Sequence, residues 1–138
     1  MPGNTSFTKT VDILQRNMDT ASLRRQVIAN NIANAETPNF KRSYVNFEAE
    51  LSRALASEKL DTSIGVLTHE RHIPFRKSVD YRVVRPGLVL DYLTTAKNNG
   101  NNVDIERELM QATENQMLYE LMGSALGFQF NQVDIVLR

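Results

Sequence analysis

The stretch "IANNIANAETPNFKR", residues 28–42, marks the end of a long helix. Ile28, Ile32 and Ala35 continue a helical spacing through it, although asparagine is only a modest helix former. Thr37-Pro38 then stops the helix, because proline has no N–H and keeps the preceding residue out of the α region. The stretch therefore predicts a helix that persists to about residue 35 and is followed by a turn.

An apolar seam leads up to this point from the N-terminus. Its members recur at alternating spacings of four and three residues, with one polar interruption: Phe7, Val11, Leu14, Met18, Ala21, Arg25, Ile28, Ile32 and Ala35. This heptad spacing is typical of a helix that packs lengthwise against another helix. With Asn4, Thr5 or Ser6 as the N-cap, it predicts one helix from about residue 5 to about residue 35.

The C-terminal third carries a second seam of the same kind. Its members are Ile105, Leu109, Ala112, Gln116, Tyr119, Gly123, Leu126, Phe130, Val133 and Leu137. Asn102 or Asp104 can cap the start, and the acidic residues that follow suit the positive end of a helix dipole. The pattern predicts a second long helix from about residue 104 to about residue 137.

The middle of the chain has a different character. Residues 45–57 have a helical pattern, and residues 80–93 alternate around Arg85-Pro86-Gly87, which predicts a small β-hairpin. We expect a mainly α fold in which the two long terminal helices pair as a coiled-coil-like hairpin. Its segments are an N-terminal helix (1–36), a variable middle with a short helix, loops and the hairpin (37–101), and a C-terminal helix (102–138).

Composition excludes several classes of function. The 138 residues suit one domain, and 16 basic side chains balance 16 acidic ones, so no electrostatic footprint for nucleic acid is present. The chain has no cysteine, which removes disulfides, thiolate metal sites and cysteine nucleophiles. The N-terminus has no apolar run of signal-peptide type, and no stretch is long enough to span a membrane.

Apolar residues off the two seams indicate association with other chains. They are Ile13, Leu23 and Val27 on the first helix and Met110, Met117, Leu118, Leu121, Met122 and Phe128 on the second. A two-helix hairpin leaves such surface exposed, and large exposed apolar surfaces mark interfaces. The alternative is a small helical bundle closed by the helix at 45–57. The amides of Asn30, Asn31 and Asn34 are expected to bond a neighbouring helix or the loop after Thr37.

The end of the first helix also resembles the N-terminal signature of bacterial flagellar rod, hook and related axial proteins, A-N-N-[IL]-A-N-x-x-T-x-G-[FY]-[KR]. The matching residues are Ala29, Asn30, Asn31, Ile32, Ala33, Asn34, Thr37, Phe40 and Lys41, and Asn39 stands where the family usually has glycine. The short middle and the segments "FKRSYVNFEAEL", "HERHIPF" and "GNNVDIERE" are similar to one type of proximal rod protein. The sibling type of proximal rod protein is the nearest alternative.

The resemblance implies a structural subunit of the proximal rod of the flagellar basal body, which assembles helically, transmits torque and lines the export channel. Its implied partners are other copies of itself, rod proteins of the FlgC and FlgF types, the adaptor FliE, the membrane-ring protein FliF and the flagellar type III export apparatus. The subunit would lie in the periplasmic space, exported without a cleaved signal peptide. No cofactor, metal or nucleic acid is implied.

Two sets of residues are candidates for these roles. The expected assembly interface comprises Ile28, Asn30, Asn31, Ile32, Asn34, Thr37, Phe40, Leu109, Tyr119, Leu126, Phe130 and Val133. The resemblance also implies a short export motif, Phe-x-x-x-apolar, which Phe7 and Val11 fit. Both are equally explained as ordinary seam residues.

Two other classes of function remain open from the residues alone. A cytosolic adaptor could bind partner helices through the same apolar stripes. A metal-dependent enzyme could use His69 and His72, although "HERH" lacks the H-E-x-x-H spacing and lies in a predicted loop. No nucleophile elbow, phosphate loop or carboxylate pair is present in the sequence, so we expect no enzyme.

Overall fold

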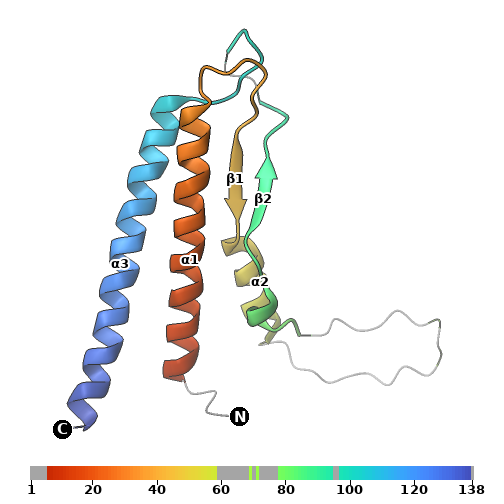
Figure 1. Ribbon diagram of the computed structural model, residues 1–138. Coiled ribbons are helices and arrows are strands. Elements are labelled where there is room, and N and C mark those ends of the chain that lie inside the picture. Colours follow the sequence, from red (N-terminus) through yellow and green to blue (C-terminus); the bar gives the residue numbers. More distant parts are fainter. Residues whose placement is uncertain (1–5, 59–68, 70, 72–77, 95–96, 138) are drawn as a thin grey trace. The chain divides into compact units, whose positions relative to one another are not determined.

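The computed structural model describes residues 6–58, 69, 71, 78–94 and 97–137. In order, its elements are α1 (Ser6–Ala33), β1 (Ser43–Asn46), α2 (Glu48–Glu58), the 3-10 helix η1 (Tyr81–Val83), β2 (Gly87–Leu90) and α3 (Ile105–Leu137) (Figure 1). The chain divides into two compact units, residues 1–45 with 88–138 and residues 46–87. The mainly helical fold with two long terminal helices is confirmed.

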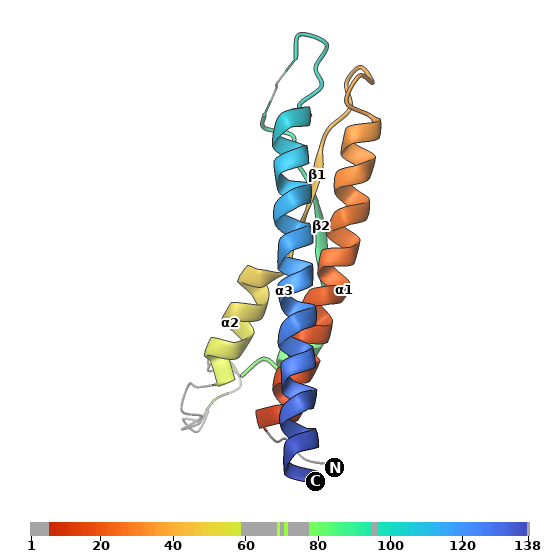
Figure 2. The same cartoon turned by 90° about the vertical axis from the view of Figure 1, so that its left-hand side faces the viewer.

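Helices α1 and α3 lie side by side and run in opposite directions (Figures 1 and 2). Near one end the rings of Phe7 and Phe130 meet edge to face, with centroids 6.1 Å apart. Near the other, Asn31 Nδ2 donates to Glu108 Oε2 at 3.1 Å. We call the first the terminal end and the second the loop end of the pair. The predicted coiled-coil-like hairpin is therefore present.

The predicted seam of α1 agrees with its burial, apart from Arg25, which is exposed. The predicted seam of α3 is half wrong. Ala112, Leu126 and Val133 are half-buried as expected, but Leu109, Gln116 and Phe130 are exposed. The residues one position earlier, Glu108, Asn115, Met122 and Gln129, are buried or half-buried instead. Of these, Glu108 and Asn115 are polar although they are buried. The search for apolar periodicity therefore selected the neighbouring row, which contains Leu109 and Phe130.

All four expected boundaries of the two long helices hold within two residues. Asp104 caps α3, since its Oδ1 accepts from the backbone N–H groups of Glu106 and Arg107 at 3.1 and 3.4 Å. Helix α1 ends at Ala33, and the chain then makes backbone turns from Asn34 to Phe40. Of the proposed N-caps of α1, Asn4 and Thr5 lie outside the described residues.

The predicted hairpin around Arg85–Gly87 is wrong in its pairing. A two-stranded antiparallel sheet exists, but β2 pairs with β1, more than 40 residues earlier (Figure 1). The segment before Pro86 forms η1 rather than a strand. The Asp91 N–H continues the ladder by donating to the Arg42 carbonyl at 3.0 Å. The sheet thus joins the segment after the signature to the segment that leads into α3.

In the second unit, α2 contacts η1, and Ser57 Oγ accepts from the Val79 N–H at 2.9 Å. The predicted middle helix begins later than expected, because Val45 and Asn46 belong to β1. Phe47 and Leu51, from its predicted apolar face, are 1% and 6% exposed. The helix is confirmed with its start moved to Glu48.

The metal hypothesis finds no support within the described part of the chain, where no three ligating side chains come together. His69 is exposed and accepts from the Arg71 N–H through Nδ1 at 3.2 Å. His72 lies outside the described residues. No described helix is long and apolar enough to cross a membrane.

Candidate functional site

A cluster of buried polar side chains joins the end of α1, the strand β1 and the start of α3. We call this cluster the polar junction and define it by Asn31, Arg42, Asn101, Asn102 and Glu108. All five residues are no more than 7% exposed. Buried polar groups are tolerated only where they are hydrogen-bonded, so the partners of each side chain decide what the junction does.

The side-chain amide of Asn31 pairs with the backbone of β1 as a neighbouring strand would. Its Oδ1 accepts from the Ser43 N–H at 3.0 Å, and its Nδ2 donates to the Ser43 carbonyl at 2.8 Å. The same Nδ2 reaches Glu108 on α3. One amide therefore ties a helix to a strand and to a second helix. Because an amide carries both donors and an acceptor, neither aspartate nor leucine could replace it here.

Glu108 and Arg42 form a buried ion pair at the centre of the junction. Glu108 Oε1 accepts from Arg42 Nε at 2.9 Å and lies 2.8 Å from Nη2, while the two side chains are 1% and 9% exposed. Arg42 Nη2 also donates to Gln111 Oε1 at 3.2 Å. Since Glu108 Oε2 accepts from Asn31, both carboxylate oxygens have partners. Removing either charge would leave the other one buried and unpaired, which is strongly destabilising.

Asn101 closes the C-terminal end of α1. Its Nδ2 lies 2.9–3.0 Å from the carbonyl oxygens of Asn34, Ala35 and Thr37. Carbonyls at a helix C-terminus have no partner within the helix, so this side chain supplies one from more than 60 residues away. Its Oδ1 accepts from the Val103 N–H at 2.7 Å and so fixes the entry into α3.

The side chain of Asn102 joins the two backbone segments at the end of the β1–β2 sheet. Its Oδ1 accepts from the Arg42 N–H at 2.7 Å, and its Nδ2 donates to the Asp91 carbonyl at 2.7 Å. Asp91 is itself held in a turn by Thr94, whose hydroxyl donates to Asp91 Oδ2 at 2.8 Å. This hydrogen bond, with those from the Thr94 and Leu93 N–H groups, lowers the pKa of Asp91 despite an opposing effect of desolvation.

The outer edge of the junction depends on two residues with positive φ. Asn39 has φ 59° and Gly100 has φ 79°. The Asn39 N–H donates to the Asn99 carbonyl at 3.0 Å, and Lys41 Nζ donates to the Gly100 carbonyl at 2.8 Å. A Cβ on Gly100 would stand 2.7 Å from Asn39 Oδ1, and the positive φ favours glycine at this position in any case. Asn39, which replaces the glycine of the signature, adopts the left-handed conformation that the signature requires.

Comparison with known proteins matches both the signature and the chain as a whole. The sequence profile of the family described as "Flagella basal body rod protein" matches residues 14–41, most of α1 and the turn after it. Curated proteins named "Flagellar basal body rod protein FlgB" are similar along nearly the whole chain. The one from Borrelia hermsii is 43% identical over 132 residues, covering 96% of this chain and 98% of its own. The chain belongs to the FlgB family of flagellar basal body rod proteins. Relatives from Bacillus subtilis and Escherichia coli are 32% and 30% identical, covering 95% and 90% of this chain and 95% and 89% of their own.

Membership of the FlgB family makes the chain a structural subunit of the flagellar rod, and the cytosolic adaptor is not favoured.

The two segments that resemble the family, the signature and "GNNVDIERE", supply the residues of the polar junction. The first supplies Asn31 and is followed directly by Arg42, and the second supplies Asn101, Asn102 and Glu108. The two motifs bind each other within one chain.

The expected interface residues from the signature lie in different environments. Ile28 and Asn31 are buried within the chain. The amides of Asn30 and Asn34 bond each other at 2.7 Å at the surface, and Thr37 Oγ1 donates to Asn34 Oδ1 at 3.4 Å. A bridge from these two amides to a helix of another copy stays a prediction. Ile32 and Phe40 are half-buried, and Thr37 is exposed.

The expected interface residues from α3 are more exposed. Leu109, Tyr119 and Phe130 are 53%, 41% and 50% exposed, and Leu126 and Val133 are half-buried along α1. Arg42, Asn101, Asn102, Glu108 and Asn115 were not identified from the sequence. Polar residues carry no periodic signal of burial, and only the pairing of the two motifs would have found them.

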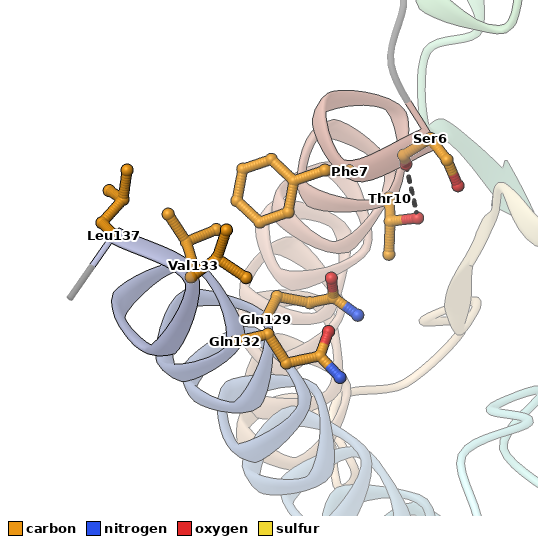
Figure 3. A pocket seen from close by; sticks show the side chains of 8 residues that line it. Ser6, Phe7, Thr10, Gln129, Gln132, Val133 and Leu137 are labelled. Carbon is orange, nitrogen blue, oxygen red and sulfur yellow. Dashed lines mark hydrogen bonds between the residues drawn. The ribbon is translucent and has the colours of Figure 1, made fainter.

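The terminal end of the pair holds the proposed export residues. Figure 3 shows Phe7 and Thr10 of α1 facing Gln129, Val133 and Leu137 of α3 across a shallow groove. Phe7 also contacts the ring of Phe130. Val11 lines the adjoining groove with Leu126 and Phe130. In the folded chain, both proposed export residues are therefore part of the helix seam.

Proposed function

We propose that this subunit forms part of the proximal rod, where copies assemble helically around the export channel and transmit torque. The observation that carries the proposal is FlgB family membership across nearly the full chain. A rigid helix pair whose one end is closed by the polar junction, and whose α3 surface remains largely apolar, suits a building block that must be completed by neighbours.

The proposed neighbours are other copies of the chain, rod proteins of the FlgC and FlgF types, the adaptor FliE and the membrane-ring protein FliF. The proposed location is the periplasmic part of the basal body. Export through the flagellar type III apparatus, without a cleaved signal, would bring the chain there. These assignments rest on the resemblance of the signature, and the exposed apolar residues are consistent with them.

Phe7 and Val11 are proposed as an export motif that is read before the chain folds. Because both side chains pack along α3 and are half-buried, a receptor could contact their whole surface only while the two helices are apart. Phe7→Ala should then lower secretion of the unfolded chain, whereas Phe130→Ala, which disturbs the same contact from the other side, should not. If the two variants were secreted equally, Phe7 would act only in the contact between the two helices and not as an export motif.

The test of the proposed function is incorporation. In a strain that lacks the gene for this chain, a tagged copy should restore swimming and should co-purify with isolated basal bodies. Cross-linking in those basal bodies followed by mass spectrometry should recover FliE, FliF or the other rod proteins. A tagged copy that restores swimming but stays in the cytosol would overturn the proposal in favour of an adaptor.

A further inference from the structure

The loop at the outer edge of the polar junction contains a chemically reactive dipeptide. Asn99 is followed by Gly100, and no other asparagine in the chain is followed by glycine. Asparagine amides are among the thermally labile groups of proteins, because the next backbone nitrogen can attack the side-chain carbonyl carbon. Glycine permits this attack most readily, since it has no side chain to hinder the approach. Asn99 is also exposed, so water and base reach it.

The reaction needs no enzyme, cofactor or oxidant. The Gly100 nitrogen loses its proton to solvent and forms a bond to Asn99 Cγ, while the bond from Cγ to Nδ2 breaks and Nδ2 takes up a proton and leaves as ammonia. The product is a cyclic succinimide. Water then opens the ring at either of its carbonyl groups. One opening gives aspartate, and the other gives isoaspartate, in which the main chain runs through the former side chain and is one atom longer.

The folded chain turns the Gly100 nitrogen away from this attack. The Gly100 N–H donates to the Lys97 carbonyl at 3.1 Å and closes a four-residue turn. Asn99 lacks the positive φ of a type II turn, so the turn is of type I, which sets ψ of Asn99 to about 0°. Ring closure needs this peptide group rotated toward the side chain. The amide itself is not protected, because the Asn101 N–H donates to Asn99 Oδ1 at 3.1 Å and polarises it.

Contacts with the segment after α1 hold the peptide group in this orientation. The Asn99 carbonyl accepts from the Asn39 N–H at 3.0 Å, and the Gly100 carbonyl accepts from Lys41 Nζ at 2.8 Å. Rotation of the peptide between Asn99 and Gly100 would break the bond to Asn39 and the bond that closes the turn. The loop must therefore open locally before the ring can form.

We propose that Asn99 is a site of spontaneous deamidation in the unfolded chain, and that closure of the polar junction suppresses the reaction. A chain that stays unfolded accumulates modified Asn99, whereas a folded chain keeps its amide. The reaction belongs to the subunit alone and does not depend on the neighbours named in the proposed function.

The two products have different consequences for the junction. Aspartate keeps the length of the main chain and an acceptor at Oδ1, and it is a common turn residue. Isoaspartate lengthens the main chain between Asn99 and Gly100, so the turn cannot keep its geometry. The next residue is Asn101, whose Nδ2 lies 2.9–3.0 Å from three carbonyl oxygens at the end of α1. We therefore expect isoaspartate, and not aspartate, to weaken the closure of α1.

The rate is measured on the purified full-length chain at one mildly alkaline pH, in native buffer and in urea. Circular dichroism verifies that the native sample is helical. Trypsin cuts after Lys97 and Arg107 and releases residues 98–107, in which fragment masses locate the replacement of NH2 by OH. We expect conversion of Asn99 in urea, and a rate on the order of tenfold slower in native buffer, because the loop must open first. Asn98, which is followed by asparagine, is the internal control and should remain largely unmodified.

A variant of the junction tests the coupling in native buffer. Asn101→Ala removes the side chain that bonds the end of α1, so conversion of Asn99 should accelerate toward the rate in urea. Glu114→Ala, at an exposed position of α3, is the matched control and should keep the wild-type rate. A variant that unfolds altogether still gives a defined result, because the wild-type chain in urea provides the upper limit of the rate.

Asn99→Asp separates the effects of the two products. It introduces the charge without lengthening the main chain, and its melting temperature should lie within about 2 °C of the wild type. The isoaspartate fraction, purified from chain aged in urea and then refolded, should melt about 5 °C lower, since hydrogen bonds of the turn are lost. An isoaspartate fraction as stable as Asn99→Asp would contradict the expected effect on closure.

Three further outcomes would overturn the proposal. Equal rates in urea and in a helical native sample would show that the junction does not protect Asn99. No conversion in urea would remove Asn99 as a modification site. Conversion of Asn98 as fast as that of Asn99 would show that Gly100 does not select the site. Failure of the proposed function would look different, because it concerns incorporation into basal bodies and leaves these rates unchanged.

Discussion

The two ends of the α1–α3 pair are built on different principles. At the loop end, Asn31, Arg42 and Glu108 are buried, and hydrogen bonds satisfy them within the chain. At the terminal end, Phe7 and Phe130 make one aromatic contact, and the last residues of α3, Ile135 to Leu137, are 74–84% exposed. The polar side chains of the loop end are thus paired within the chain, whereas one aromatic contact joins the helices at the terminal end. We therefore expect the loop end to contribute more to the stability of the free subunit.

The largest effect is expected from Glu108→Ala at the loop end. This change leaves the Arg42 guanidinium buried without its carboxylate and removes a partner of Asn31, at a cost of about 3–5 kcal/mol in the free energy of unfolding. Urea unfolding of the purified chain, followed by circular dichroism, measures it. Glu114→Ala, an exposed position on the same helix, is the control and should change stability by less than about 0.5 kcal/mol. Equal effects of the two would show that the junction is not the stable region.

Asn31 and Asn30 form the second comparison, between adjacent residues of one type. Asn31→Ala leaves the Ser43 backbone groups without their partner and should cost about 1–3 kcal/mol. Asn30→Ala exchanges an exposed asparagine for the best helix former and should be neutral or slightly stabilising. The sign of the shift in melting temperature separates the two residues. If Asn30→Ala destabilised the free subunit, Asn30 would have to make a stabilising contact beyond its surface hydrogen bonds with Asn34.

Gly100→Ala tests the outer edge of the polar junction, at the loop end of the pair. Gly100→Ala combines a positive φ with a Cβ 2.7 Å from Asn39 Oδ1, and we expect a loss of about 1–2 kcal/mol. In an Asn39→Gly background the close contact disappears while the unfavourable φ remains, so part of the loss should be recovered. A double-mutant cycle by thermal unfolding measures this coupling. Additive effects would mean that the Asn39 side chain moves aside without cost.

Phe7→Ala probes the terminal end in the free subunit. Because Phe130 is half exposed and the contact is a single aromatic pair, the loss should be only about 1 kcal/mol. Amide hydrogen exchange should already be faster in residues 6–19 and 120–137 of the wild-type chain than in residues 20–31 and 105–118. Uniform protection along both helices would remove the distinction between the ends.

The smallest effect concerns pH. Hydrogen bonds from Thr94 lower the folded-state pKa of Asp91 below its unfolded value. The resulting stabilisation is present above the unfolded pKa and is lost as pH falls through the folded pKa. Thr94→Ala should therefore raise the pKa of Asp91 and weaken the acid dependence of unfolding. A carboxyl titration followed by NMR measures the shift, and Thr113→Ala, at an exposed position of α3, is the control.

The sequence predicted the parts of the fold that depend on local periodicity. Both long helices and the end of α1 near Pro38 follow from spacing and from the chemistry of proline, and Asp104 is one of the two N-caps that were predicted for α3. The rotation of α3 by one residue could not be predicted in this way, because Glu108 and Asn115 are polar and yet face α1. The neighbouring row through Leu109 and Phe130 is more apolar, so periodicity alone favoured the wrong side of the helix.

Pairings between residues that are distant in the sequence also could not be predicted. Residues 80–93 alternate as a strand should, but nothing local indicates that β2 pairs with β1 rather than with its own neighbour. Asn31 was expected to bond another element and does so, whereas the described side-chain hydrogen bonds of Asn30 and Asn34 stay within residues 30–37. The difference lies in which side of α1 each faces, and that depends on β1 and α3.

The separation in sequence of the junction's partners has a consequence for the order in which the chain can fold. Asn31 and Glu108 are 77 residues apart, and Ala21 and Asn115 are 94 apart. Closing such long loops is entropically unfavourable until the final contacts form, so topologies of this kind fold slowly. A nascent chain, or one threaded through a narrow conduit, cannot complete the junction until residues 31 and 108 are on the same side. The stable end of the pair can therefore form only where both segments are free to meet.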